Sequence, residues 1–306
     1  MTKKYHEVPT NFDSIKDCII YNKESVIESF FAGSFIFFYD TCSILHHSSS
    51  KHRNHIIKFL HKKSATIIIT RTVLMELSPN TIHPTQIKYI NELYDSGLKI
   101  LLFEEEFVFD CLKEFMVISN KDANLLLGYA AKEVSKSKTK TYELLHTILP
   151  SSFSEKLKGN NPGDKELYAN FFKYSRESKE EGDSLAEELI LICIIVLSKM
   201  SLGRYVFFSD DLRARIKIID TIKYINKWHS FKDLYQLTTA ATVYKIYIDK
   251  ILTDKEKMIE IMEGAYGKKA PIFFIGEFDI QQVNDELECS KIIDRIINEI
   301  EFRVVY

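Results

Sequence analysis

Three short runs of apolar residues constrain the fold of this chain most. They span Phe35–Tyr39, Thr66–Ile69 and Tyr205–Phe208, and each is followed by sequence that is compatible with a helix. A strand without polar alternation has to be covered on both faces, which is typical of parallel sheets whose strands are connected by helices. The runs therefore predict an α/β fold with a central parallel sheet.

The composition agrees with a large globular protein. With 306 residues, 45% of them hydrophobic and 27% charged, the chain is long and apolar enough to bury a sizeable core. Its formal net charge of -2 provides no general basic field, so a nucleic acid has to be bound locally. Two basic segments, Lys51–Lys63 and Lys132–Lys140, are the candidates, with an ordinary solvated surface as the alternative for each.

The cysteines and the apolar segments indicate the class of protein. Five cysteines without a CxxC pair argue against a disulfide framework and a zinc ribbon, and they agree with a reducing compartment. The N-terminal residues lack the apolar run of a signal peptide. The longest apolar run, Leu189–Leu197, is shorter than the roughly 20 residues that cross a bilayer, so it predicts a buried helix. We therefore expect a cytoplasmic protein without a membrane partner.

The remaining sequence divides into segments around the predicted core. We expect a helical segment over residues 1–34, a core domain over residues 35–240 and an α+β extension over residues 241–306. A mostly helical insertion at about residues 104–181 interrupts the core and contains a loop, Leu149–Asp164, rich in Ser, Asn, Gly and Pro. The later predicted elements are a helix at Phe231–Ile251, a strand at Pro271–Ile280, a helix at Asp285–Ile300 and a last strand at Phe302–Tyr306.

Carboxylates follow two of the apolar runs directly. Asp40 comes after the first run, and Ser209, Asp210 and Asp211 come after the third. Because ligand and metal chemistry gathers at the carboxyl ends of parallel strands, these acids are site candidates. The adjacent Asp210 and Asp211 repel one another unless a cation or a basic side chain lies near them. A helix N-cap is the alternative role for one residue of this pair.

Three further acids are placed by helices. Glu76 lies about two turns beyond the second run, in a helix whose apolar residues face the sheet. Asp183 and Glu187 lie at the start of the strongly apolar helix that contains Leu189–Leu197, and because they are four residues apart they share a face. The alternative for Glu76 is an ordinary surface position, and for the other two it is an interaction with the helix dipole.

We expect the acids from the strand ends and from the apolar helix to converge. Clustered carboxylates without a lysine partner are costly in a folded protein, and a hard divalent cation with oxygen ligands removes this cost. Magnesium and manganese suit such ligands and also bind substrate phosphate oxygens. A site of this kind activates water and stabilises the charge that develops on a phosphodiester, so the pattern favours hydrolysis of a nucleic-acid backbone.

The same motifs resemble those of the PIN-domain nuclease family. FIFFYDTCSIL is similar to the family's first strand and Asp-Thr/Ser signature, and TIIITRTVLMEL is similar to its second strand and acid-bearing helix. The stretch from GDSLAEEL to SDDLRARIKI is similar to its closing motif, an acid-led helix followed by a strand that ends in Thr/Ser-Asp-Asp. The resemblance covers Phe35–Ser78 and Gly182–Lys232. It implies a three-layer α/β/α fold to which the insertion and the extension are added.

The resemblance also implies roles for individual residues. Ser209 would orient the last acid or the water. For Arg213, a bidentate phosphate contact and a salt bridge to Asp210 or Asp211 stay equally open. The implied catalytic residues and metal ligands are Asp40, Glu76, Asp183 and Asp210, with Asp211 and Glu187 as additional ligands, and the implied substrate-binding residues are Ser209, Arg213, Thr41, Lys51 and Arg53.

The sequence therefore predicts an endoribonuclease that depends on Mg²⁺ or Mn²⁺, with DNA kept open as a substrate. By analogy with the family, it would act as a toxin or in antiviral defence. One alternative is a catalytically inactive PIN-like scaffold for a partner protein. Another is a phosphatase-like enzyme with Asp40 as nucleophile, which ranks lower because Cys42 stands where that class would place a second acid. A homo-oligomer, or a partner bound through the insertion or the extension, also stays open.

Overall fold

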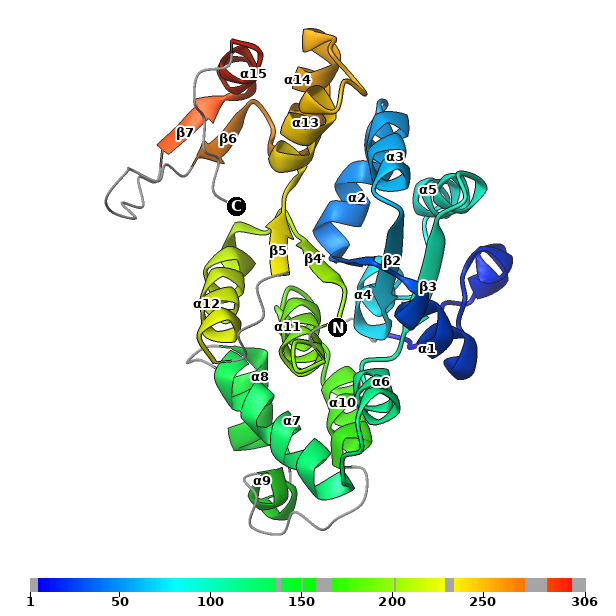
Figure 1. Cartoon of the computed structure of the whole chain (residues 1–306), viewed down its shortest axis with the longest axis vertical. Helices are drawn as coiled ribbons and strands as arrows, with labels where there is room; N and C mark the ends of the chain where they lie inside the picture. The colour runs from blue at the N-terminus through cyan, green and yellow to red at the C-terminus, as the bar shows by residue number, and fades with distance from the viewer. Residues whose placement is uncertain are drawn as a thin grey trace.

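A five-stranded parallel sheet runs through the centre of the molecule (Figure 1). The computed structural model describes residues 5–135, 139–149, 151–157, 167–200, 202–228, 234–272 and 285–298. The strand order is β3-β2-β1-β4-β5, with every neighbouring pair parallel. The strands are β1 (Phe35–Tyr39), β2 (Ala65–Thr70), β3 (Lys99–Phe103), β4 (Arg204–Phe208) and β5 (Leu234–Leu237).

The three apolar runs form the middle of this sheet, so the prediction of an α/β fold with a central parallel sheet is confirmed. They become β1, β2 and β4, and nearly all of their residues are buried. Phe38 of β1 pairs with Ile68 of β2 on one side and with Phe207 of β4 on the other. Because β1 is the central strand, its carboxyl end lies between the carboxyl ends of two neighbours.

The two edge strands, β3 and β5, are absent from the sequence prediction. β5 also corrects the helix predicted over Phe231–Ile251, because Leu234–Leu237 pair with β4 instead. The helix α13 begins only at Thr239, after Thr238, whose side chain accepts a hydrogen bond from the Ala241 amide. Backbone pairing with the exposed edge of β4 outweighs the local helical preference of this segment.

Helices cover both faces of the sheet, an arrangement consistent with three α/β/α layers (Figure 1). In that view α2, α3 and α5 lie above the sheet, and α1, α11 and α12 lie below it. The helices that precede the insertion are η1 (Phe12–Ser14), η2 (Lys16–Cys18), α1 (Lys23–Ala32), α2 (Thr41–Ser49), α3 (Arg53–Lys62), α4 (Arg71–Leu77) and α5 (Pro84–Asp95).

The predicted insertion is helical where the structure describes it. Its elements are α6 (Phe107–Phe115), α7 (Asn120–Val134), α8 (Lys140–Glu143), the π-helical turn η3 (Leu144–Ile148), α9 (Ser151–Leu157) and α10 (Leu167–Glu177). The loop predicted at Leu149–Asp164 is therefore partly helix, and its residues 158–164 lie outside the described ranges. The insertion is followed by α11 (Leu185–Leu197), and α12 (Leu212–Trp228) comes after β4.

The C-terminal extension combines helices with a small hairpin. It contains α13 (Thr239–Ile248), α14 (Lys255–Tyr266), the antiparallel strands β6 (Lys269–Ile272) and β7 (Asp285–Glu288), and α15 (Cys289–Ile297). The strand predicted at Pro271–Ile280 is described only for its first two residues, and the last predicted strand lies outside the described ranges. The helix predicted from Asp285 starts four residues later, because Asp285–Glu288 pair with β6.

α11 is the buried helix that the sequence predicts, and it positions the site. All residues of this helix are buried, and it packs against α4, α6, α7 and α12. A helix that is apolar all round has to lie in the core. Because α11 leads into the parallel strand β4, it runs against the strands and begins at their carboxyl ends. None of the helices that the structure describes is both long and apolar enough to cross a membrane.

Candidate active site

Asp40 links the end of β1 to the start of α2. Its Oδ1 accepts a hydrogen bond from the Ser43 amide at 2.7 Å, which caps the helix, and the Ser209 hydroxyl donates to its Oδ2. The side chain is fully buried. Burial raises the pKa of Asp40 to about 7, the negative charge of Asp210 adds to the rise, and the hydrogen bonds from Ser209 and Ser43 oppose it. With a pKa of about 7, the Asp40 carboxyl group gains and loses its proton near neutral pH.

Glu76 projects from α4 toward the start of α2. The Thr41 hydroxyl donates a hydrogen bond to Glu76 Oε2, and Lys179 Nζ lies 2.9 Å from Glu76 Oε1. Burial raises the pKa of Glu76 above its usual range, although Lys179 and Thr41 favour the charged form. The neighbouring residues Asp40 and Thr41 thus contact two different segments. Asp40 binds Ser209, which follows β4, and Thr41 binds Glu76 of α4, which follows β2.

Glu187 is a buried acid with an oxygen that has no hydrogen bond from the described residues. Its side chain lies in the first turn of α11 and is only 6% exposed. Oε2 of Glu187 is buried and has no hydrogen-bond partner among the described residues. Burial, together with the negative charges of Glu76, Asp40 and Asp211, raises the pKa of Glu187 well above its usual range. A buried carboxylate of this kind needs a proton or a cation.

Asp211 completes a group of four carboxylates, and its backbone N–H donates to Ser209 Oγ at 3.2 Å. The Cys42 thiol lies near enough to all four carboxylates for their charges to affect it. Burial and then the charges of Asp40, Glu187, Asp211 and Glu76 raise the pKa of this thiol far above the usual range. We call Asp40, Glu76, Glu187 and Asp211 the acid cluster.

Lys179 separates Asp183 from the acid cluster. Its ammonium is 2.9 Å from Glu76 Oε1 and 2.5 Å from Asp183 Oδ1, and the Tyr5 ring lies 5.1 Å from it. The other oxygen of Asp183 accepts from the Glu180 amide at 2.7 Å. Asp183 precedes α11 and stays outside the helix, whereas Glu187, four residues later, faces inward. Asp183 therefore lies beside Glu76 through their shared contact with Lys179, and Glu187 lies near Asp40, Glu76 and Asp211.

Asp210 lies near Asp40, and its Oδ2 accepts a hydrogen bond from the Ser43 hydroxyl at 3.4 Å, but the extension supplies most of its hydrogen bonds. It accepts hydrogen bonds from the Thr239 amide and the Thr239 hydroxyl, both at 2.7 Å, and from the Tyr266 hydroxyl at 2.6 Å. Burial favours the neutral acid, but the hydrogen bonds from His46 and Thr239 and the nearby His47 outweigh it and lower the pKa of Asp210 to about 2. Asp210 thus fastens α13 and α14 to the end of β4, and it is Asp211 that acts on Glu187.

The other predicted site residues are only partly brought together. Ser209 and Thr41 contact the acid cluster through Asp40 and Glu76, as described above. Arg53 instead holds Glu92 with two hydrogen bonds of 2.5 and 2.8 Å. Lys51 is exposed beyond the end of α2, a helix that carries the chain roughly 13 Å away from Asp40 at about 1.5 Å per residue. The side chain of Arg213 lies outside what the structure describes.

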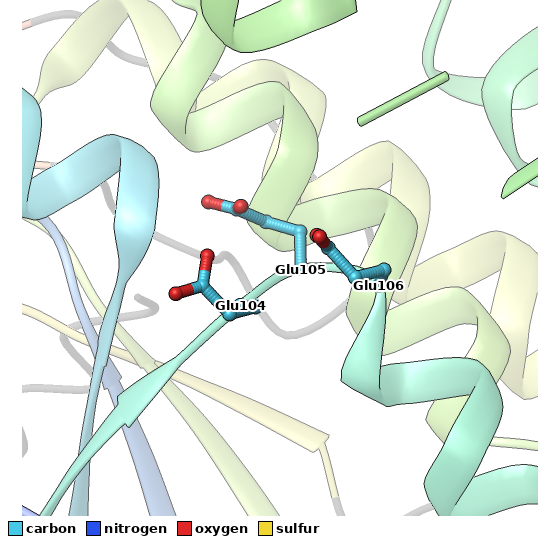
Figure 2. A group of neighbouring side chains, drawn as sticks. All are labelled: Glu104, Glu105 and Glu106. Carbon is cyan, nitrogen blue, oxygen red and sulfur yellow. The ribbon is translucent and has the colours of Figure 1, made fainter. Parts of the chain in front are cut away.

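A second group of acids follows β3 at the same edge of the sheet. Glu104, Glu105 and Glu106 offer three oxygen atoms within 4.8 Å of one another (Figure 2). Among the described residues, no other group of three or more possible metal ligands is as compact. Such a group could hold a metal ion, but arginines already neutralise it. Arg71 holds Glu104, and Arg176 lies 2.9 Å from Glu105 and 2.8 Å from Glu106.

Arg176→Met is expected to destabilise the protein by on the order of 3 kcal/mol, because it leaves Glu105 and Glu106 close together without their cation. Arg176 is 5% exposed and Glu105 is fully buried. Urea unfolding measures the loss, and Lys223→Met, at an exposed position of α12, serves as the control. Adding Glu105→Gln and Glu106→Gln should recover much of the stability. No recovery would show that packing, not charge, makes Arg176 important.

The acid cluster is wider than the group at Glu104–Glu106, and it differs in chemistry as well. The Lys179 ammonium pairs with Glu76 of the cluster, and a buried oxygen of Glu187 has no hydrogen bond from the described residues. Sequence reasoning overlooked Lys179, although its position four residues before Asp183 places a cation within reach. In comparisons with models of protein families, with curated proteins and with solved structures, nothing matches this chain.

Proposed function

We propose that this protein is a nuclease that hydrolyses the phosphodiester bonds of RNA with Mg²⁺ or Mn²⁺ bound at the acid cluster. One observation carries the proposal: a buried oxygen of Glu187 has no hydrogen-bond partner among the described residues, and three further carboxylates act on it. A buried carboxylate of this kind lowers the stability of the folded protein, and a bound divalent cation removes this loss.

The donor set fits a hard cation. Burial and then the charges of four carboxylates raise the pKa of the Cys42 thiol, and the hydroxyls of Thr41 and Ser209 hold two of these carboxylates in place. Carboxylate oxygens are ligands that suit magnesium or manganese. No three residues of the acid cluster, all of them described by the structure, offer ligand atoms within 4.8 Å of one another, so they would reach an ion partly through waters, several of which magnesium keeps.

Asp40, Glu187 and Asp211 would hold the ion, with Glu76 at the side of Lys179. The ion would lower the pKa of water and stabilise charge on the phosphate. Ser209 fixes one oxygen of Asp40 and accepts from the Asp211 amide, so a single hydroxyl sets the position of two acids. Without a cation, burial raises the pKa of Asp40 to about 7, so an ion bound there would also offset the cost of the Asp40 charge. Lys179 favours the charged form of Glu76.

The choice of RNA rests on the resemblance of the three motifs to PIN-domain nucleases, and DNA is an outcome of the test. The full chain is incubated with single-stranded RNA and DNA of the same sequence, with Mg²⁺, with Mn²⁺ and with EDTA. We expect cleavage of RNA that EDTA abolishes. We also expect each metal to raise the melting temperature, since a ligand that binds only the folded state at 100 times its Kd adds about 2.7 kcal/mol.

The scaffold hypothesis is favoured by one observation, the Lys179 ammonium that already neutralises part of the cluster. It predicts neither cleavage nor a metal-dependent shift in melting temperature, and this pair of results would overturn the nuclease proposal. The proposed role as a toxin or defence effector has its own test. Expression should arrest growth of the host cell, and the Glu187→Gln variant should not.

A further inference from the structure

A cavity of about 460 Å³ lies between the insertion and the start of α11. Its lining includes Lys140, Tyr142 and Glu143 from α8, Glu180 and Asp183 from the segment before α11, and Lys217 from α12. The cavity adjoins the acid cluster, because Asp183 in its lining contacts the same ammonium, that of Lys179, as Glu76 does. A group bound in the cavity would therefore lie beside the carboxylates that are proposed to act on the phosphodiester.

A rigid aromatic surface lies at this cavity. The ring of Tyr142 stacks on the ring of His146 with 4.1 Å between centroids and 18° between planes. His146 Nδ1 also lies 2.8 Å from the carbonyl oxygen of Tyr142, which fixes the two rings relative to one another. Tyr142 remains 42% exposed. His146 stacks on the Tyr142 ring, and the exposed part of Tyr142 lines the cavity, where a planar ligand could contact the ring as bases of single-stranded nucleic acids contact aromatic side chains.

Two carboxylates beside Tyr142 supply hydrogen-bond acceptors. Lys140 Nζ lies 3.0 Å from Oε2 of Glu143 and 3.0 Å from Oε2 of Glu180, and its own side chain is 4% exposed. The buried ammonium therefore fixes both carboxylates through one oxygen each. The side chains of Glu143 and Glu180 are 49% and 62% exposed, so their second oxygens could accept hydrogen bonds from N–H groups of a ligand. On a nucleobase, such donors are found on the Watson–Crick edge that single-stranded RNA leaves free.

The charges of the cavity favour a base over a phosphate. Both lysines of the lining are already paired, Lys140 with Glu143 and Glu180, and Lys217 with Glu188 at 2.8 Å. Asp183 adds a further carboxylate to the lining. Among the lining residues that the structure describes, a phosphate would meet these negative charges without an unpaired lysine, whereas a base with imino and amino donors would meet acceptors and a stacking surface.

We propose that this cavity binds a nucleobase of single-stranded RNA next to the bond to be cleaved, and that it prefers guanine. Guanine presents an N–H and an NH₂ side by side, which a carboxylate accepts together, whereas uracil presents a single donor. The position of the base relative to the bond rests on the proposed nuclease function. The binding of the base itself does not.

The test measures binding without cleavage. The full chain with Glu187→Gln is titrated in EDTA with a fluorescent oligouridine that contains one guanosine and with the same oligouridine without it. We expect tighter binding of the guanosine oligonucleotide, and we expect guanosine monophosphate to compete better than uridine monophosphate. Tyr142→Ala should weaken binding about 10-fold, while Tyr142→Phe keeps the ring and the affinity. Glu143→Gln combined with Glu180→Gln should remove the preference for guanine.

Tyr94→Ala is the matched control, since Tyr94 is 48% exposed on α5 and does not line the cavity. Equal affinity for both oligonucleotides, together with unchanged binding by Tyr142→Ala, would overturn the proposal. Binding of the mononucleotide but not of the oligonucleotide would also overturn it, in favour of a site for free nucleotides. If the base binds as expected but the unmutated protein cleaves no nucleic acid, only the nuclease proposal fails. If it cleaves with a KM that Tyr142→Ala leaves unchanged, only the base site fails.

Discussion

Glu187→Gln is expected to lower metal-dependent cleavage of RNA by more than about 100-fold. Glutamine keeps the shape of the side chain but removes the charge that a cation requires, and even the loss of an outer partner of a metal ligand typically costs 10- to 100-fold. The variant should fold, because Oε2 of Glu187 has no hydrogen bond from the described residues to lose. The ratio kcat/KM for a labelled single-stranded RNA in Mg²⁺ measures the effect.

The matched control for this variant is Glu114→Gln, which makes the same chemical change at an exposed position of α6 and should cleave like the unmutated protein. Cleavage at the normal rate by Glu187→Gln would remove the acid cluster from consideration as the active site. If Asp183→Asn or Asp210→Asn abolished cleavage without loss of stability while Glu187→Gln remained active, the ligand set implied by the family resemblance would hold instead.

The sequence was most informative where one local property decides the structure. The runs that become β1, β2 and β4 are apolar on both faces, so burial alone determines their state and their parallel arrangement. The position of Asp40 follows directly, since an acid after a central strand has to lie at the edge of the sheet. The edge strands β3 and β5 were missed, because they depend on pairing with strands that are distant along the chain.

The choice between neighbouring acids shows what local pattern does not determine. Asp210 and Asp211 follow the same strand, and adjacent side chains of an extended segment point to opposite sides. Which of them faces the acid cluster depends on Thr239 and Tyr266, residues 29 and 56 positions further along the chain that hold Asp210. In the same way, Asp183 and Glu187 share a helical face only if the helix already includes Asp183, and it begins at Leu185.

The same carboxylates should make stability depend on pH when no metal is bound. The pKa of Asp40 rises from 3.8 to about 7 through burial, and the pKa values of Glu76 and Glu187 are raised as well, also by burial first. Between the two values for Asp40, the folded protein retains a proton that the unfolded chain has released, so stability falls as pH rises. Asp210, with a pKa of about 2, is ionised in both states above about pH 5 and contributes no slope there.

Asp40→Asn should therefore be more stable than the unmutated protein at pH 8 in EDTA, by up to on the order of 4 kcal/mol if the whole rise in the pKa of Asp40 reflects the cost of its charge. Asparagine still offers an oxygen to the Ser43 amide and a polar atom to Ser209. At pH 4 the two proteins should differ little, because Asp40 is then largely protonated in the folded state. Urea unfolding at several pH values measures this difference, and adding Mg²⁺ at pH 8 should stabilise the unmutated protein more than the variant. Parallel pH profiles for the two proteins would mean that Asp40 carries its charge in the fold without cost, and that no cation is needed beside it.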